Sequence, residues 1–409
     1  MAIAILVTYG AVPRSARFPS PPHTTDVDEH LQVVSSIASV APEAWDTLAG
    51  DNPFLRHAFL NALHETNCAV PAKGWAPQYV LLRKDGALKA ALPLYLKAHS
   101  YGEYVFDWAW ADAYDRHGLD YYPKLLCAVP FTPVRGPRLL VSEPEDRLHL
   151  IATALALSKE LRVSSFHCLF PADGDADAFE AAGMMIRHGV QFHWRNNGYA
   201  TFDDFLASLN HDKRKKIRQE RRKVREAGIT FEWHEGSAIS EADWTFFYRC
   251  YARTYREHHS TPYLTPEFFH SIGRTMPENL VLVLALRNNR PIAVSLEVHN
   301  GTRLFGRYWG AIEHHPILHF ETCYYQVIEY CIARGLQVFE GGAQGEHKMA
   351  RGLMPVETRS AHWIAKREFA TAIERFLAQE TRGIEHYMDE LNERKPFRRD
   401  EGEGRATQG

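Results

Sequence analysis

The sequence lacks the short signatures that would assign an enzyme class directly. It contains no Gly-x-x-x-x-Gly-Lys-Ser/Thr phosphate loop, no Gly-x-Ser-x-Gly elbow and no His-Glu-x-x-His pair. These absences argue against a P-loop NTPase, an α/β-hydrolase and a zinc protease of that type. Two pairs of adjacent histidines occur, but neighbouring side chains diverge on a helix or strand, so we expect no metal site.

Cysteine is scarce, and long apolar runs and an excess of one charge are missing. Six cysteines occur among 409 residues and none forms a Cys-x-x-Cys pair, which is typical of reduced thiols in a cytoplasmic protein. No apolar run approaches the roughly 18 residues of a membrane helix, so we expect no integral membrane segment, and the short apolar start lacks the basic flank of a signal peptide. The formal net charge of −3 excludes a polycation and an acidic disordered chain, and 45% hydrophobic residues suffice for folded cores.

The first half of the chain follows a leader, residues 1–30, in which closely spaced prolines and the lack of periodicity predict disorder. Hydrophobic periodicity and turn residues then predict helices and strands in alternation. The expected elements are a helix at 52–65, strands at 78–83, 87–97 and 103–108, a helix at 145–161, a strand at 164–170, a helix at 175–182 and a strand at 184–194.

The second half repeats this order of elements without repeating the sequence. We expect a strand at 229–234, helices at 241–258 and 266–275, strands at 280–286, 292–299 and 303–309, a helix at 317–334, and strands at 336–339 and 360–366. A three-strand meander followed by helix, strand and strand is the layout of the GNAT acyltransferase fold. We therefore predict an α/β fold with mixed sheets: tandem GNAT-like domains at 31–200 and 228–390, a basic linker helix at 201–227 and a disordered tail at 391–409.

The linker helix carries a concentrated positive charge. Nine of the thirteen residues from Lys213 to Arg225 are basic, and like charges at helical spacing repel one another. Such a cluster in a nearly neutral chain indicates an anionic partner: a phosphorylated substrate, a coenzyme pyrophosphate or RNA. The alternative is a solvated basic face. The candidate phosphate-binding residues are Lys213, Arg214, Lys216 and Arg218.

A glycine-rich loop follows the predicted strand at 336–339. It places donors, acceptors and charges close together, namely Gln344, Glu346, His347, Lys348 and Arg351, among four glycines that permit close backbone approach. For acyl transfer, Glu346 or His347 could take the proton of an amine, and Lys348 could stabilise an oxyanion. Gln344 and Arg351 are candidate substrate-binding residues. The alternative is a tight structural turn.

An aromatic and acidic stretch lies between the predicted third strand and the long helix of the first half. Asp107 and Tyr114 belong to it, and Arg135 and Arg138 follow downstream. In the GNAT layout this position reads the ligand, so these four residues are candidate substrate contacts. The alternative is a packed aromatic loop.

Taken as a set, these segments resemble the bacterial FemAB-like proteins, predicted N-acyltransferases of the GNAT superfamily linked to peptidoglycan. The resemblance rests on 107–114, 122–126, 129–133 with 136–138, the basic run from His211, and Gly341-Gly-Ala-Gln-Gly-Glu-His-Lys348. The chain is more distantly similar to the Fem peptidyltransferases, in which a Phe-Lys-x-Gly-Phe-like motif supplies a lysine to the reaction centre. The matching stretch here is 347–353, in which the phenylalanines are replaced. The resemblance therefore implies that Lys348 is the lysine of the reaction centre.

The resemblance implies a cytoplasmic N-acyltransferase that moves an acyl or aminoacyl group to an amine on a small molecule or peptide, such as a cell-wall precursor. Its co-substrate would be acyl-CoA or aminoacyl-tRNA, so tRNA is a candidate partner, and no tightly bound cofactor is expected. The rival hypothesis is a non-catalytic GNAT-like module that binds cell-wall fragments or nucleic acid.

Overall fold

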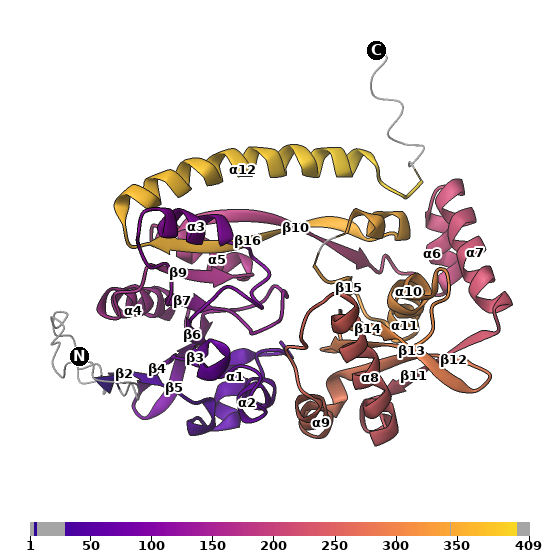
Figure 1. The fold of residues 1–409 in the computed structure, drawn as a ribbon, viewed down its shortest axis with the longest axis horizontal. Helices are drawn as coiled ribbons and strands as arrows, with labels where there is room; N and C mark the ends of the chain where they lie inside the picture. The colour runs from indigo at the N-terminus through magenta and orange to yellow at the C-terminus, as the bar shows by residue number, and fades with distance from the viewer. Residues whose placement is uncertain (1–3, 6–28, 344, 399–409) are drawn as a thin grey trace, which may run out of the picture. The chain divides into compact units, whose positions relative to one another are not determined.

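The computed structural model describes residues 4–5, 29–343 and 345–398 (Figure 1). The chain forms two compact units, each assembled from three separate stretches. Unit 1 consists of Met1–Gly189, Tyr263–Thr275 and Thr358–Gly383, and unit 2 consists of Val190–Pro262, Met276–Glu357 and Ile384–Gly409. The consecutive domains and linker expected from the sequence stay a prediction, because compactness alone does not show which segments fold independently.

The predicted disordered leader and tail lie mostly outside the described residues. Within the leader, Ala4–Ile5 forms the short strand β1, and strand β2 begins at Glu29. At the other end, the helix α12 continues to Glu393, and the Arg398 N–H donates to the Ser208 carbonyl at 2.9 Å. Regular structure therefore reaches into both segments.

Unit 1 contains most of the N-terminal half of the chain. Its helices are α1 Pro42–Ala49, α2 His57–Glu65, α3 Trp108–Arg116, α4 Asp146–Glu160, α5 Asp173–Ala181 and α9 Pro266–Thr275. Its strands are β1, β2 Glu29–Val34, β3 Trp75–Pro77, β4 Tyr79–Lys84, β5 Ala87–Leu92, β6 Leu94–Lys97, β7 Lys124–Cys127, β8 Leu140–Val141 and β9 Ser165–Leu169.

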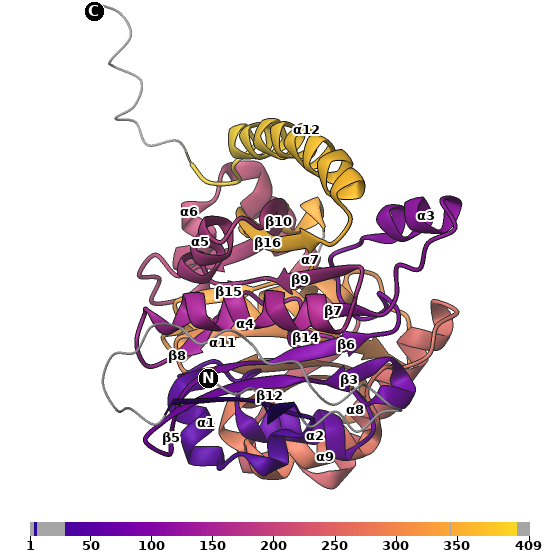
Figure 2. The same cartoon turned by 90° about the vertical axis from the view of Figure 1, so that its left-hand side faces the viewer.

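Two sheets make the framework of unit 1. One has the strand order β1-β2-β4-β5-β8, and in the other β9, β7, β6 and β3 lie side by side. Helix α4 contacts β9 of one sheet and β4 and β5 of the other (Figure 2). Its apolar residues Leu150 and Leu157 join Leu82, Leu92 and Phe166 in one buried core, so the hydrophobic effect holds the sheets against this helix.

Unit 2 holds the basic helix and the glycine-rich loop. Its helices are α6 Phe202–Ser208, α7 His211–Glu226, α8 Glu241–Glu257, α10 Leu318–Phe320 and α11 Gln326–Ala333, with 3₁₀ turn η6 at Glu346–Arg351. Its strands are β11 Ile229–Glu235, β12 Leu280–Arg287, β13 Arg290–His299, β14 Arg303–Ala311 and β15 Val338–Glu340. Three elements have residues in both units: β10 Met185–Arg195, β16 Met354–Ile364 and α12 Arg367–Glu393.

The strands of unit 2 follow the order β11-β12-β13-β14-β15-β10. The first four form an antiparallel meander, and β15 pairs in parallel with β14. Residues of α11 and of the turn before it, including Tyr325 and Ile328, pack with Val283, Leu304 and Trp194 in the core of this unit. The predicted α/β class with mixed sheets is confirmed.

The structure also bears on the predictions about the cysteines and about membrane-spanning helices. All six cysteines are free thiols, as predicted. Among the described residues, no helix combines the length and the apolar character that crossing a bilayer requires.

Two predicted strands of the first half are wrong. The run at 87–97 is divided at Pro93, which lacks the N–H that a ladder needs, so β5 and β6 belong to different sheets. The segment 103–108 is not a strand, because the acidic side chains of Glu103 and Asp107 turn inward to bind the buried Lys124, and α3 begins at Trp108.

The helix predicted at 317–334 is interrupted. A π-helical turn, Glu321–Tyr325, separates α10 from α11. Within it the Thr322 hydroxyl donates to the Leu318 carbonyl at 2.9 Å, a local contact that competes with regular helical geometry. Such turns are frequent at functional sites, and this one places Glu321 and Tyr325 toward α7.

Candidate functional site

Strands β14 and β15 pair over only three residues before they part. Arg303–Phe305 pairs with Val338–Glu340, and β14 then continues to Ala311 without β15. After β15 the chain stays with β10, because the Gly341 N–H donates to the Phe192 carbonyl at 3.2 Å. The separation begins at Gly306, where an added Cβ would lie 3.2 Å from Phe339 and 3.3 Å from Glu297. The glycine-rich loop thus begins where the two strands diverge.

Lys348 is buried within this loop. It lies in η6 and is 3% exposed, and its Nζ donates to the carbonyls of Gly342 and Ala343 at 3.0 and 3.2 Å. An ammonium has three N–H donors, so one remains for a ligand. Burial lowers the pKa of Lys348 to about 8. Within the described part of the chain no acidic side chain forms an ion pair with it, so its charge is available to a developing anion.

His347 and Glu346 lie on the exposed side of the same turn. The His347 Nε2 is 3.3 Å from the Tyr324 hydroxyl, and Glu346 accepts a hydrogen bond from the Tyr387 hydroxyl at 2.8 Å. Partial burial, together with the charges of Arg351 and Lys348, lowers the pKa of His347. The imidazole is therefore neutral at pH 7 and able to accept a proton.

Arg351 ties the loop to α7. Its Nη1 donates to the His347 carbonyl at 2.8 Å, and its Nη2 is 3.2 Å from Glu220 on α7. The guanidinium lies over the Phe320 ring, 3.5 Å from its centroid, a cation–π arrangement. These contacts hold the backbone next to Lys348 in place. Gln344, the other predicted substrate contact of this loop, lies outside the described residues.

Glu297 is a residue of this region that sequence analysis missed. It lies on β13, is 2% exposed, and its Oε2 has no hydrogen-bond partner among residues 29–343 and 345–398. Burial raises the pKa of Glu297 to about 8, so the carboxyl is mainly protonated at neutral pH. A single acid inside the apolar run 291–298 was the available signal, because a buried charge is costly unless it is paired or neutralised.

The titration of Glu297 gives a stability prediction with a defined sign. A carboxyl whose pKa is near 4.3 in the unfolded chain and about 8 in the folded one binds its proton more tightly in the folded state. Its stabilising contribution is complete below about pH 4 and declines as the pH rises to about 8. Glu297→Gln removes this dependence. The melting temperature of the variant should therefore rise relative to that of the wild type as the pH increases from 5 to 8. A constant difference across that window would contradict the prediction.

The basic run forms helix α7, but the single linker helix predicted at 201–227 is divided at Leu209 and Asn210 into α6 and α7. The Asn210 side chain caps it by accepting from the Lys213 N–H at 3.0 Å, and Ile217, Glu220 and Val224 form its buried face. Leu206 of α6, Leu209 and Ile217 of α7 are buried together in one hydrophobic cluster.

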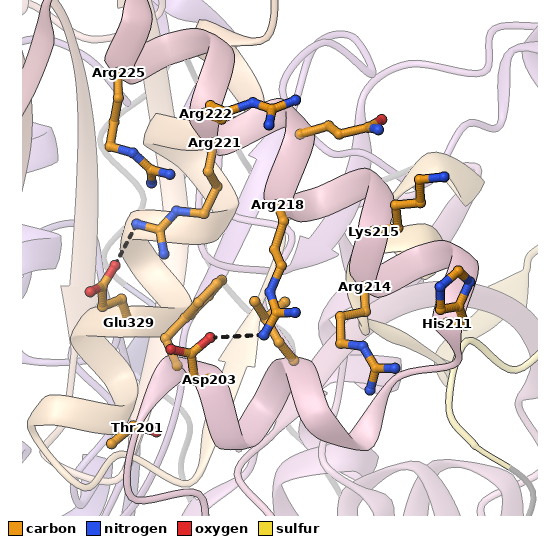
Figure 3. Close-up of a pocket in the computed structure, with 13 residues that line it drawn as sticks. Thr201, Asp203, His211, Arg214, Lys215, Arg218, Arg221, Arg222, Arg225 and Glu329 are labelled. Atoms are coloured by element: carbon orange, nitrogen blue, oxygen red, sulfur yellow. Dashed lines mark hydrogen bonds and ion pairs between the residues drawn. The ribbon is translucent and has the colours of Figure 1, made fainter.

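A cavity of about 850 Å³ lies along α6 and α7 (Figure 3). Six cations of α7 line it: Arg214, Lys215, Arg218, Arg221, Arg222 and Arg225. Acids accompany some of them, since Asp203 is 3.4 Å from Arg218 and Glu329 is 2.6 Å from Arg221 (Figure 3). Of the predicted phosphate-binding residues, Arg214 and Arg218 line this cavity, whereas Lys213 and Lys216 do not.

Asp107 belongs to a buried polar cluster of unit 1. The Lys124 ammonium contacts Asp107 and lies 2.8 Å from Glu103, and Asp107 also accepts from the Tyr121 hydroxyl at 2.7 Å. Burial raises the pKa of Asp107, but the attraction of Lys124 outweighs it and holds that pKa below its usual value. The Tyr121 hydroxyl also lies 3.1 Å from His167 Nε2. In the sequence, Lys124 stands out only as part of the segment 122–126.

The other predicted contacts of unit 1 are largely occupied by protein groups. Arg138 is 1% exposed, and its guanidinium donates to the carbonyls of Val134, Pro137 and Leu169 at 2.7 to 3.0 Å. Arg135 forms an ion pair with Asp173. Tyr114 is buried, and its ring lies 4.2 Å from that of Phe369. These contacts hold the Arg138 guanidinium and the Tyr114 ring in place, and the substrate contacts expected of all these residues stay predictions.

Comparison with solved structures identifies proteins with a similar fold. The C-terminal domain (DUF2156) of a protein assigned as a lysylphosphatidylglycerol synthetase from Agrobacterium fabrum aligns with a TM-score of 0.52 at 10% identity, over 83% of this chain and 96% of that one. FemX aligns with a TM-score of 0.51 at 12% identity, over 82% of this chain and 98% of the other. The predicted tandem GNAT-like fold is confirmed.

The family follows from the sequence itself. The FemAB-like family, described as peptidoglycan biosynthesis/recognition, matches residues 36–399, and the chain belongs to this family. No curated protein matches the chain.

Proposed function

We propose that the protein transfers an acyl or aminoacyl group to an amine, with the reaction centre at the loop that carries Lys348. The proposal depends mainly on one observation: a buried ammonium with one unused donor, located where β14 and β15 part. Family membership and the fold shared with FemX support a transferase. The acceptor would be an amine of a small molecule or peptide, such as a cell-wall precursor.

The proposed reaction needs an oxyanion stabiliser and a proton acceptor. The acceptor amine attacks the carbonyl carbon of a thioester or ester, and the carbonyl oxygen becomes an oxyanion that Lys348 stabilises. The amine gives up a proton, which the neutral His347 accepts, while Glu346 is the alternative acceptor. The oxyanion collapses, the amide forms, and the donor's thiol or hydroxyl leaves with a proton.

The cations of the α7 cavity would bind the phosphates of the donor, either acyl-CoA or aminoacyl-tRNA. Both donors are polyanions, and six lining cations supply the matching charge. Isothermal titration with acetyl-CoA and with charged tRNA tests both donors, and mass spectrometry of an added amine tests transfer. If neither donor binds, the rival hypothesis of a non-catalytic module for cell-wall fragments or nucleic acid is favoured.

Charge reversal in the α7 cavity should weaken donor binding selectively. Arg214→Glu with Arg218→Glu places two acids on the cavity wall, so the affinity for a phosphorylated donor should fall at least about tenfold and depend less steeply on salt. Because both side chains are at least partly exposed, the melting temperature should change little. Lys216→Glu with Lys223→Glu is the matched control, since both are exposed cations of the same helix that do not line the cavity. Equal losses in both variants would mean that only the overall charge matters.

A further inference from the structure

A separate cavity of about 440 Å³ lies along helix α8 of unit 2 and shares no lining residue with the α7 cavity. Three arginines of α8, Arg249, Arg253 and Arg256, line this α8 cavity together with Glu257 and Ile312. Because they are spaced by four and three residues, the arginines lie on one face of the helix. The volume is within the range of small ligand sites.

Helix α8 is anchored to the end of β14 beside this cavity (Figure 1). An added Cβ at Gly310 would overlap the backbone of α8, so the helix approaches the strand this closely only because glycine stands there. The Thr254 hydroxyl donates to the Trp309 carbonyl at 3.0 Å, and the Arg253 Nη1 donates to the Ile312 carbonyl at 2.7 Å. These contacts fix the arginine face of α8 relative to the strand.

Only one of the three arginines has an acidic partner. The Arg253 Nε donates to Glu257 at 2.7 Å, whereas Arg249 and Arg256 form no ion pair with another described residue. Like charges at these spacings repel one another. The helix dipole favours a cation in the last turn of α8, which contains Arg256 but not Arg249. The protein thus leaves two guanidinium groups without a countercharge on one cavity wall, and an anionic ligand would supply it.

The place of the cavity on the helix favours carboxylates over a phosphate. Phosphate sites commonly use a helix N-terminus, where backbone N–H groups and the positive end of the dipole meet the ligand. The α8 cavity instead lies along the C-terminal half of the helix and contains Glu257. A densely charged phosphate there would meet a carboxylate and the negative end of the dipole. Two separate carboxylates carry one charge each, and each matches the fork of one guanidinium.

The spacing of the two unpaired arginines matches an extended peptide. Arg249 and Arg256 are seven residues apart, which separates their Cα atoms by about 10 Å along the helix axis. In a polyproline II peptide, side chains three residues apart lie on one face at a separation of about 9 Å.

We propose that the α8 cavity binds an acidic peptide segment whose carboxylates at positions i and i+3 pair with Arg249 and Arg256. Arg253, held by Glu257 and the Ile312 carbonyl, keeps the wall between them in place. The inference goes beyond the proposed function and does not depend on it. No residue of the α7 cavity or of the loop at 341–352 lines the α8 cavity.

Titration calorimetry at low, fixed salt with two capped peptides tests the proposal. N-acetyl-Glu-Pro-Pro-Glu-amide carries the two carboxylates on a backbone that proline holds extended, and N-acetyl-Gln-Pro-Pro-Gln-amide is its neutral counterpart. We expect the Glu peptide to bind at least about tenfold more tightly than the Gln peptide. Equal affinities would overturn the proposal. Inorganic diphosphate is titrated into Arg214→Glu with Arg218→Glu, in which the α7 cavity is altered. Tighter binding of diphosphate than of the Glu peptide by this variant would overturn the choice of carboxylates.

A pair of substitutions locates the peptide on α8. Arg249→Gln with Arg256→Gln removes both charges while keeping polar side chains, so the preference for the Glu peptide should disappear without a change in melting temperature. Lys216→Gln with Lys223→Gln is the matched control, because it removes two charges from exposed positions of unit 2 that line neither cavity. Equal losses in the two variants, or an unchanged preference in the arginine variant, would overturn the α8 site. The donor titrations of the proposed function involve neither arginine, so the failure of one proposal leaves the other standing.

Discussion

Lys348→Ala is expected to lower kcat by roughly 10²–10³-fold, which is the loss typical of removing one oxyanion donor. The ammonium interacts more strongly with the developing oxyanion than with the neutral carbonyl, so its removal raises the barrier without weakening substrate binding. The measurement is steady-state kinetics of amide formation, with donor affinity determined separately by calorimetry. Lys348→Arg should recover only part of the rate, because a planar guanidinium places its charge differently from a compact ammonium.

The pH profile distinguishes the role of Lys348 from its alternatives. Burial lowers its pKa to about 8, so an oxyanion stabiliser loses its proton, and the enzyme its activity, as the pH rises through about 8. If the neutral amine acted as a base, activity would rise over the same range. A higher KM with unchanged kcat in Lys348→Ala would make the residue a binding anchor. Lys223→Ala, a change to an exposed lysine of α7, controls for the loss of one positive charge.

Lys124→Met is expected to destabilise the protein by about 3–5 kcal/mol, the cost of breaking a buried ion pair by removing one partner. Lys124, Glu103 and Asp107 are all less than 5% exposed. Without the ammonium, two buried carboxylates would face each other and lose the cation that contacts both of them, leaving Lys97 as the nearby lysine. Chemical denaturation monitored by circular dichroism measures the change in unfolding free energy. Arg222→Ala, which removes only an exposed pair with Glu226 at 3.6 Å, should change it by no more than about 0.5 kcal/mol.

The cause of the Lys124 effect can be checked by neutralising the acids. Burial already raises the pKa of Glu103 to about 7, and removing Lys124 would raise it further. The variant should therefore regain stability as the pH falls, when the carboxyls take up protons. Lys124→Met combined with Glu103→Gln should be more stable than Lys124→Met alone. A loss below about 1 kcal/mol in the single variant would mean that the acids escape to solvent.

Local sequence determined most of the secondary structure of this protein. The meander of unit 2, helices α4 and α8 and the basic helix α7 were predictable, because hydrophobic periodicity, capping residues and turn residues act over a few neighbours. The loop at 341–352 could likewise be identified as a candidate reactive site from its neighbouring glycines, histidine and lysine. The single acid in the apolar run of β13 carried a signal, but nothing nearby in the sequence indicated what would surround it.

Long-range contacts decided the rest, since sequence periodicity carries no information on which distant groups meet. Only the fold shows that Glu103 and Asp107 bind Lys124, so that their segment does not form the predicted strand. Only the fold shows that the Arg138 guanidinium donates to backbone carbonyls. Only the fold sorts the cations of α7 into those that line a cavity and those that do not. A buried charge must be matched by whatever tertiary structure brings beside it. The sequence therefore marked where charge and glycine gather, and the tertiary structure decided which of those groups remain available to a ligand.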